Sequence, residues 1–124
     1  MERRSFMKFT AAAGASLMLH PFESFAIPPG KKLRLALVGT GARGSSLWGR
    51  EIIKTFSDVT EFVGLSDINP GRVEYVKKML KVSCPVFSDF EQMLRETKPD
   101  YVIVTTIDAT HDEFIVKALD MGVN

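Results

Sequence analysis

The sequence predicts an α/β fold, in which helices cover both faces of a parallel sheet, and three observations lead to it. An apolar run at residues 33–38 leads directly into a Gly-x-Gly-x-x-Gly turn at residues 39–44. Three further apolar segments follow, and a segment with helical spacing separates each from the next. An aspartate, Asp67, ends the second apolar segment. Alternating strands and helices require right-handed crossovers, so we expect a Rossmann-type parallel sheet with the strand order 3-2-1-4.

Length and composition are those of one globular domain. The 124 residues include 16 basic and 15 acidic side chains, which leave a formal net charge of +1. Such a balance produces no field directed at nucleic acid or at an acidic partner. The single cysteine, Cys84, excludes an internal disulfide, and with only His20 and His111 beside it we expect no metal site. Cys84 is expected to be a small buried residue.

The start of the chain has the layout of an export signal. Arg3, Arg4 and Lys8 precede a mildly apolar stretch at residues 9–19, which is too short to span a bilayer. The same basic residues resemble the twin-arginine export motif, except that Glu2 stands where Ser or Thr is usual. That pathway carries folded cargo, which suits an enzyme that must take up a cytosolic nucleotide before export.

These features divide the chain into three parts. We expect a signal peptide at residues 1–26, cleaved after Ala26, then a Pro-Gly-Lys linker at residues 27–32 and a nucleotide-binding domain at residues 33–124. The expected partner of the signal is the twin-arginine translocase, and the expected location is periplasmic or otherwise exported, without a membrane anchor. The alternative is a basic amphipathic start to a cytosolic protein.

The glycine turn is the candidate nucleotide site. In a dinucleotide fold Gly39 would permit the tight turn, Gly41 would let the backbone approach the pyrophosphate, and Gly44 would allow close helix packing. The N–H groups and the positive end of the following helix attract an anion, and Arg43 can add a charge. The alternative is an ordinary glycine turn beside a surface aspartate.

Asp67 follows the second predicted strand, residues 60–66, about 20 residues beyond the glycine turn. Its carboxylate can accept hydrogen bonds from ribose hydroxyls and would repel the 2'-phosphate of NADP. Arg72 could pair with that phosphate if Asp67 turned away. We therefore predict NAD as the cofactor, with NADP as the alternative, and we include Ile68 of the same loop in the site.

The remaining elements follow from periodicity. The predicted helices are residues 45–56, 70–80, 90–97 and 111–121, and the further strands are residues 85–87 and 101–105. Each helix is expected to bury its apolar residues of three-and-four spacing. These are Trp48, Ile52, Ile53 and Phe56; Val73, Val76 and Leu80; Phe90, Met93, Leu94 and Thr97; and Ile115, Ala118 and Leu119.

Polar residues and glycine mark the ends of these helices. Asp89 or Ser88 is expected to cap the third helix and Thr110 the last one, which Gly122 should end. The strand at residues 101–105 is β-branched and aromatic, and we expect it to be central in the sheet.

With these features in place, residues 32–124 resemble the nucleotide-binding half of the Gfo/Idh/MocA oxidoreductases. That family follows its fourth strand with Thr-Pro-Asn-x-x-His, and this chain has Thr-Ile-Asp-Ala-Thr-His at residues 106–111. The threonine and the histidine match at the same spacing. Ile107 and Asp108 replace the proline and the asparagine, which alters the shape expected for the loop.

The resemblance implies that Thr105, Thr106 and His111 lie beside the nicotinamide and its ribose. The alternative for His111 is a helix-start histidine that bonds the backbone. The complete set of predicted cofactor-binding residues is Gly39, Thr40, Gly41, Ala42, Arg43, Gly44, Asp67, Ile68, Arg72, Thr105, Thr106 and His111.

The resemblance also implies an oxidoreductase that moves hydride between nicotinamide and a carbinol carbon of a sugar or polyol. The family's catalytic lysine, in a Glu-Lys-Pro motif, and the Asp and His of its second domain would come from sequence beyond Asn124. We therefore predict no catalytic residue in this chain, which is expected to be C-terminally truncated and inactive alone. The alternatives are a redox-neutral NAD-dependent glycosidase of the same family, a non-catalytic nucleotide-binding fragment, and a methyltransferase.

Overall fold

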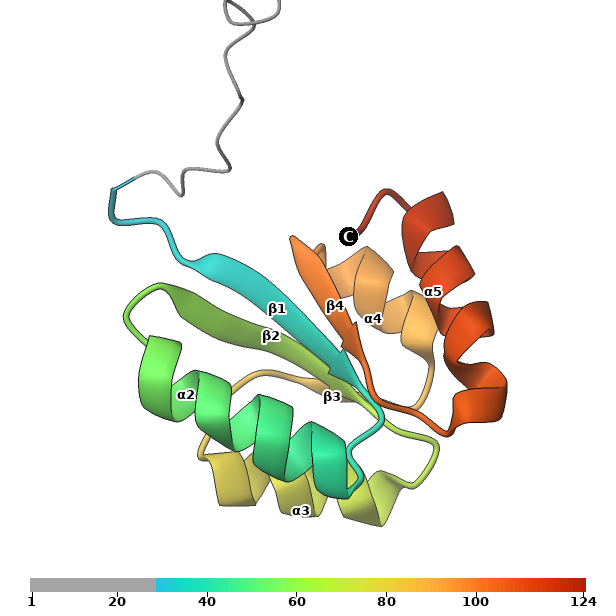
Figure 1. The fold of residues 1–124 in the computed structure, drawn as a ribbon, viewed down its shortest axis with the longest axis horizontal. Coiled ribbons are helices and arrows are strands. Elements are labelled where there is room, and N and C mark those ends of the chain that lie inside the picture. The colour runs from blue at the N-terminus through green and yellow to red at the C-terminus, as the bar shows by residue number, and fades with distance from the viewer. Residues whose placement is uncertain (1–28) are drawn as a thin grey trace, which may run out of the picture.

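The computed structural model describes residues 29–124, so the predicted signal peptide and the start of the linker lie outside the described residues. The described chain forms a four-stranded parallel sheet in the order β3-β2-β1-β4. Figure 1 shows this sheet with helices packed against it. The predicted fold class and strand order are confirmed. The strands are β1 (Leu33–Val38), β2 (Thr60–Ser66), β3 (Val86–Phe87) and β4 (Tyr101–Val104).

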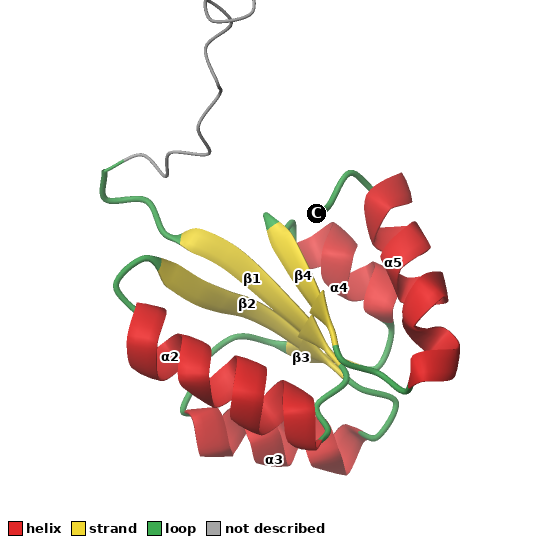
Figure 2. Ribbon diagram, viewed as in Figure 1, coloured by secondary structure: helices red, strands yellow, loops and turns green. Residues whose placement is uncertain are grey.

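The helices divide between the two faces of the sheet, as Figure 2 shows. The helix made of η1 and α2 lies on one face together with α3, whereas α4 and α5 lie on the other face. This division follows from right-handed crossovers on the two sides of β1. The helices are η1 (Arg43–Arg50), α2 (Glu51–Phe56), α3 (Pro70–Leu80), α4 (Phe90–Thr97), the short 3-10 helix η2 (Asp108–Thr110) and α5 (His111–Asp120).

Strand β1 supplies the core on both faces because successive side chains of a strand point in opposite directions. Ala36 and Val38 belong to the apolar cluster with α4 and α5, whereas Leu37 belongs to the cluster with α3. Leu37 and Leu65 are completely buried. Cys84 is buried in the α3 cluster, as predicted, and burial raises the pKa of its thiol.

The predicted buried faces of α3 and α4 are confirmed, and so is one of the predicted caps. Asp89 precedes α4, and its Oδ1 accepts a hydrogen bond from the N–H of Gln92 at 3.0 Å. Asn69 caps α3, a role that was not predicted for it: its Oδ1 accepts a hydrogen bond from the N–H of Arg72 at 3.1 Å. Gly122 follows α5 at φ 75°, in the left-handed region that favours glycine.

The first helix departs most from the predicted pattern. Segment η1 has π-type i→i+5 hydrogen bonds, and its buried residues, Gly44 and Gly49, are five positions apart. The predicted three-and-four face is only partly buried: Ile52 and Ile53 are half-buried, whereas Trp48 and Phe56 are 44% and 51% exposed. The prediction that these two aromatic residues are buried is wrong. Trp48 lies in the wider η1 helix, whose buried residues are glycines, whereas Phe56 is the last residue of the α-helix α2.

Helix α5 buries a different face from the predicted one. Ala118 is buried as expected, but Ile115 and Leu119 are 46% and 60% exposed. Phe114 packs against the core instead, and its ring meets the ring of Phe90 edge-on with centroids 5.0 Å apart. The prediction for Ile115 and Leu119 is wrong because a neighbouring aromatic residue on α4 selects the face.

Thr110 precedes α5 but does not cap it. Its Oγ1 lies 3.0 Å from the carbonyl oxygen of Ile107 and 3.0 Å from Oγ1 of Thr106. These contacts close the 3-10 turn η2, so the predicted cap is wrong and the threonine stabilises the turn that leads into the helix.

Strand β4 lies at an edge in the described part of the chain, so the prediction of a central strand is wrong for this sheet. It pairs with β1, and its four residues are half-buried. On its other side, the N–H of Val102 donates to the carbonyl oxygen of Asn124 at 2.7 Å. Among residues 29–124, no helix has both the length and the apolar character needed to cross a membrane.

Candidate functional site

The glycine turn connects β1 to η1, and its three glycines meet three different surroundings. Gly39 has φ 86°, and a Cβ there would lie 2.6 Å from the carbonyl carbon of Thr105. A Cβ on Gly44 would collide with the carbonyl oxygen of Gly39 and come within 2.6 Å of Oγ1 of Thr105. A Cβ on Gly41 would meet nothing within 4 Å. The first and third glycines are thus required by packing, whereas the second faces open space.

Thr105 ties the loop after β4 to the glycine turn. Its hydroxyl lies 2.6 Å from the carbonyl oxygen of Gly39 and 3.2 Å from that of Val38, and its N–H donates to Val38 at 2.9 Å. These bonds bring together residues more than 60 positions apart in the sequence. The turn and the loop form one hydrogen-bonded unit at the carboxyl edge of the sheet, where ligands of open α/β sheets bind.

The first helix begins directly after Gly41, where a Cβ would meet nothing within 4 Å. The first helical hydrogen bond runs from the N–H of Ser45 to the carbonyl oxygen of Gly41 at 2.9 Å. The N–H groups that precede this bond, those of Ala42, Arg43 and Gly44, have no acceptor within the helix. Together with the helix dipole they favour an anionic ligand at Gly41.

Asp67 lies at the end of β2 and is only 5% exposed. Its Oδ2 accepts from the N–H of Thr40 at 2.8 Å and from the Thr40 hydroxyl at 2.9 Å. Its Oδ1 accepts from the N–H of Asn69 at 2.8 Å, and Nη1 of Arg72 lies 3.6 Å from Oδ2. The carboxylate is therefore part of the architecture that joins β2 to the glycine turn.

These contacts set the charge of Asp67. Burial by itself would raise the pKa of the carboxyl. Hydrogen bonds from Asn69 and Thr40 to the ionised form outweigh burial, and the charge of Arg72 adds to them, so the pKa lies below its ordinary value of 3.8. At neutral pH the end of β2 therefore carries a fixed negative charge.

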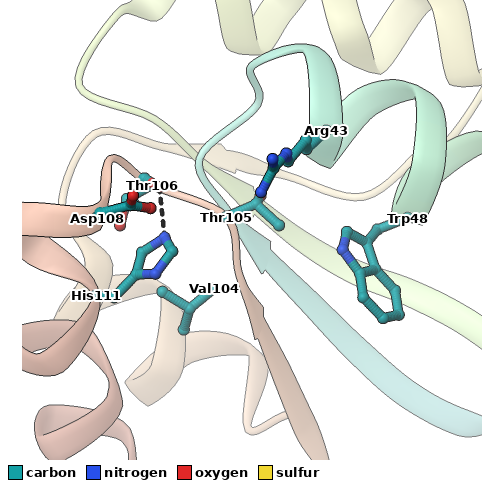
Figure 3. Close-up of a pocket in the computed structure, with 7 residues that line it drawn as sticks. All are labelled: Arg43, Trp48, Val104, Thr105, Thr106, Asp108 and His111. Atoms are coloured by element: carbon teal, nitrogen blue, oxygen red, sulfur yellow. Dashed lines mark hydrogen bonds between the residues drawn. The ribbon is translucent and has the colours of Figure 1, made fainter.

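A cleft of about 320 Å³ opens beside the turn, between η1 and the loop that follows β4. Figure 3 shows Arg43 and Thr105 between His111 on one side of the view and Trp48 on the other. Four of the predicted site residues line this cleft, and it also includes three residues that the prediction missed. The lining residues are Arg43, Trp48, Val104, Thr105, Thr106, Asp108 and His111.

His111 lines the cleft and also bonds the backbone, as the alternative interpretation of this residue expected. Its Nε2 contacts the carbonyl oxygen of Thr106, drawn as a dashed line in Figure 3. A carbonyl oxygen can only accept, so Nε2 is the donor in this contact. The histidine is thereby oriented by the loop that it follows.

The other predicted residues lie around the turn rather than in the cleft. Thr40 is 2% exposed, and its N–H and hydroxyl both bond Asp67. Ile68 is 88% exposed, and Arg72 is half-exposed beside the carboxylate. The spacing of Trp48 from Ile52 is that of a buried α-helical face, so the sequence favoured a core position for Trp48 over the alternative of a ligand-stacking role.

The described residues suit a dinucleotide and give no support for a metal. Open space at Gly41, free N–H groups at the helix start and a fixed carboxylate after β2 match the needs of a diphosphate and a ribose. Within residues 29–124 no three His, Cys, Asp or Glu side chains come together as a metal-binding cluster.

Comparison with known proteins agrees with this geometry. Residues 33–124 match the family model described as "Oxidoreductase family, NAD-binding Rossmann fold". In an alignment 133 positions long, the chain is 32% identical to a glycosyl hydrolase family 109 protein of Stenotrophomonas maltophilia. This alignment covers 99% of this chain and 28% of that one. It is 31% identical over 90 residues to an inositol 2-dehydrogenase of Agrobacterium fabrum, covering 73% of this chain and 26% of that one.

A solved structure shows the same likeness in three dimensions. The chain resembles the scyllo-inositol dehydrogenase of Lactobacillus casei, crystallised with NAD(H) and scyllo-inositol, with a TM-score of 0.64 and 26% identity over 76% of this chain and 27% of that one. The chain thus spans about a quarter of the length of these relatives. The family match over residues 33–124 places the chain in the Gfo/Idh/MocA oxidoreductase family, with an NAD-binding Rossmann fold over these residues.

Proposed function

We propose that this chain is the cofactor-binding part of an NAD-dependent oxidoreductase that acts on a sugar or polyol. The observation that carries the proposal is the hydrogen-bonded unit of glycine turn and β4 loop, which has open backbone at Gly41 and a cleft next to it. When bound, NAD supplies a nicotinamide that accepts or returns a hydride. The inositol dehydrogenases among the relatives support a polyol substrate.

The chain's own groups have separate tasks in this proposal. The N–H groups around Gly41 and Arg43 bind the diphosphate, and the Asp67 carboxylate accepts from the adenosine ribose, with the exposed Ile68 beside it. Thr105, Thr106 and His111 hold the nicotinamide side in the cleft. We assign the general acid or base to no residue of this chain, because the resemblance gives that task to the lysine of a Glu-Lys-Pro motif, which residues 33–124 do not contain.

The electrostatics at β2 favour NAD over NADP. Asp67 carries a negative charge that would repel a 2'-phosphate. Arg72, the cation that could bind that phosphate, is already paired with Asp67. A ribose with two free hydroxyls can instead donate to the carboxylate. The selectivity therefore depends on Asp67 staying ionised and oriented.

The test is cofactor affinity in the purified full-length protein, measured by calorimetry with NAD, NADP and S-adenosylmethionine. Gly41→Val should lower NAD affinity at least about tenfold, because a side chain would occupy the diphosphate position. Asp67→Asn should weaken NAD and relax the rejection of NADP, whereas Asp120→Asn, at the exposed end of α5, is the matched control. Unchanged NAD affinity in both site variants, or tighter binding of S-adenosylmethionine, would refute this assignment.

A second candidate is a redox-neutral glycosidase that uses tightly held NAD. The alignment to the glycosyl hydrolase family 109 protein favours it, because it covers 99% of this chain, against 73% for the inositol dehydrogenase. The two reactions differ in their net products. Net formation of NADH with a polyol supports the dehydrogenase, and release of a sugar leaving group without net cofactor change supports the glycosidase.

Export by the twin-arginine route is part of the proposal. Its support is the run that begins with Arg3 and Arg4, ahead of a weakly apolar stretch. Replacing both arginines with lysine keeps the charge and should leave the protein in the cytoplasm of its host, measured by fractionation. Normal export of that variant would point to another route or to a different start of the mature chain.

A further inference from the structure

Thr40 stands between two glycines of the turn, yet it faces away from the open side. It is 2% exposed, and both of its hydrogen-bond donors lie against one oxygen of Asp67. The N–H lies 2.8 Å and the hydroxyl 2.9 Å from Oδ2. The two groups that would make Thr40 a direct ligand contact are therefore already used within the protein.

This double contact leaves the two oxygens of Asp67 in different states. A carboxylate offers about two acceptor positions on each oxygen. Both acceptor positions of Oδ2 are filled by the N–H and the hydroxyl of Thr40, and Nη1 of Arg72 lies 3.6 Å from the same oxygen. Oδ1 has one bond, from the N–H of Asn69 at 2.8 Å. An acceptor position on Oδ1 is thus the one left for a ligand hydroxyl.

We infer that Thr40 is a positioning residue whose hydroxyl fixes the Asp67 carboxylate, so that Oδ1 is offered to the ribose and the cofactor with a free 2'-hydroxyl is preferred. The inference rests on the proposed function, because it takes Asp67 as the ribose acceptor. A threonine suits this role since its branched side chain has few rotamers.

Loss of the hydroxyl should release one of the two bonds that hold Oδ2. The carboxylate could then turn toward Arg72, whose guanidinium is half-exposed at 3.6 Å and is the charged group of α3 that faces it. From β1 and the turn, the contacts to Asp67 are the uncharged groups of Thr40. A carboxylate drawn toward Arg72 would be a poorer hydrogen-bond acceptor for the ribose hydroxyls. It would also repel a 2'-phosphate less strongly.

The experiment compares Thr40→Val, which removes the hydroxyl at nearly constant volume, with Thr40→Ser, which keeps a hydroxyl. NAD and NADP affinities are measured at neutral pH in the purified full-length protein. We expect Thr40→Val to lower the ratio of NAD to NADP affinity about tenfold, the size of a lost hydrogen bond to a charged group. Thr40→Ser should stay within about twofold of the native ratio.

The pH at which NAD affinity falls is the second readout. The hydroxyl bonds the ionised form of Asp67, so its removal should shift the acid loss of NAD affinity to higher pH. Thr40→Ser should restore the native profile. A role in packing alone would weaken NAD and NADP equally and leave the midpoint of this profile in place.

A third comparison places Thr40→Val in the Asp67→Asn background. If Thr40 acts through Asp67, the valine should change NAD affinity there by less than about twofold, since neighbours in one network are not additive. A further loss as large as in the native background would overturn the inference. If Thr40→Val does not fold, Thr40→Ala removes the same hydroxyl and is measured in the same way.

The outcomes also separate the inference from the function on which it rests. Unchanged cofactor preference in Asp67→Asn itself overturns the ribose site and this inference with it. An altered preference in Asp67→Asn, together with a native ratio and a native pH profile in Thr40→Val, overturns the inference alone. A lowered ratio with a shifted profile, both restored by serine, supports it.

Discussion

The β1 and β4 units share one plan, a parallel strand, a loop at the carboxyl edge of the sheet and a helix, but they differ in how completely they are enclosed. Four of the six residues of β1 are buried, whereas all four residues of β4 are half-buried. β1 lies between β2 and β4, and β4 pairs as a strand with β1 in the described part of the chain. The number of neighbouring strands therefore decides burial in segments of similar apolar character.

The two loops show the same contrast. The turn after β1 is held by close glycine contacts and by Asp67, so its shape is fixed from several directions. The loop after β4 is tied to this turn by Thr105, but Ile107 in that loop is 72% exposed. The cleft lies between them. The enclosed unit contributes Arg43 and Trp48 to its lining, and the more open unit contributes the other five lining residues, so substitutions on the two sides should have different consequences.

The largest expected effect is at Gly44. Gly44→Ala would push a Cβ into the carbonyl oxygen of Gly39 and toward Oγ1 of Thr105, and backbone atoms cannot move aside cheaply. We expect a loss of about 3 kcal/mol or more in the free energy of unfolding, measured by urea denaturation. Gly41→Ala is the matched control, with nothing within 4 Å of its new Cβ, and should change stability by less than about 0.5 kcal/mol. Equal losses at both positions would remove the distinction between packing and ligand-facing glycines.

A smaller effect should separate two adjacent residues of α5. Phe114→Ala removes an edge-on contact with Phe90 at 5.0 Å and should cost about 2 kcal/mol, less than for a fully buried ring. Ile115→Ala, at a side chain that is 46% exposed, should cost less than about 0.5 kcal/mol. Urea midpoints of the two variants measure the difference directly. A larger loss of stability for Ile115→Ala than for Phe114→Ala would mean that α5 buries the face that the sequence pattern predicted.

The smallest effect concerns acid stability. The folded-state pKa of Asp67 lies below 3.8, so its bonds stabilise the fold above that pH and lose this contribution as pH falls through the lower folded value. Asp67→Asn should be less stable than the native protein near neutral pH. The gap between the two unfolding free energies should narrow as the pH is lowered below about 4. A gap that stays constant with pH would mean that the charge of Asp67 adds nothing to stability.

Local patterns predicted most of the framework. The bounds of β2, α3 and α4 agree with the predicted ranges, because apolar runs, Pro70 and Asp89 mark these elements within a few residues of sequence. The strand order follows from right-handed crossovers between alternating elements. The glycine spacing likewise predicts a ligand-facing turn at Gly41, since only backbone conformation and close approach are involved.

Contacts between distant segments decided the remainder. The exposure of Trp48 follows from a π-type helix whose glycines pack against the turn and α3, and the buried face of α5 follows from Phe90 on another helix. The sequence by itself determined the order of elements, the glycine turn and an acid after β2, because these depend on neighbours along the chain. The tertiary structure decided that Thr40 holds Asp67 and that His111 and Trp48 line one cleft, because both arrangements bring together residues that are far apart in the sequence.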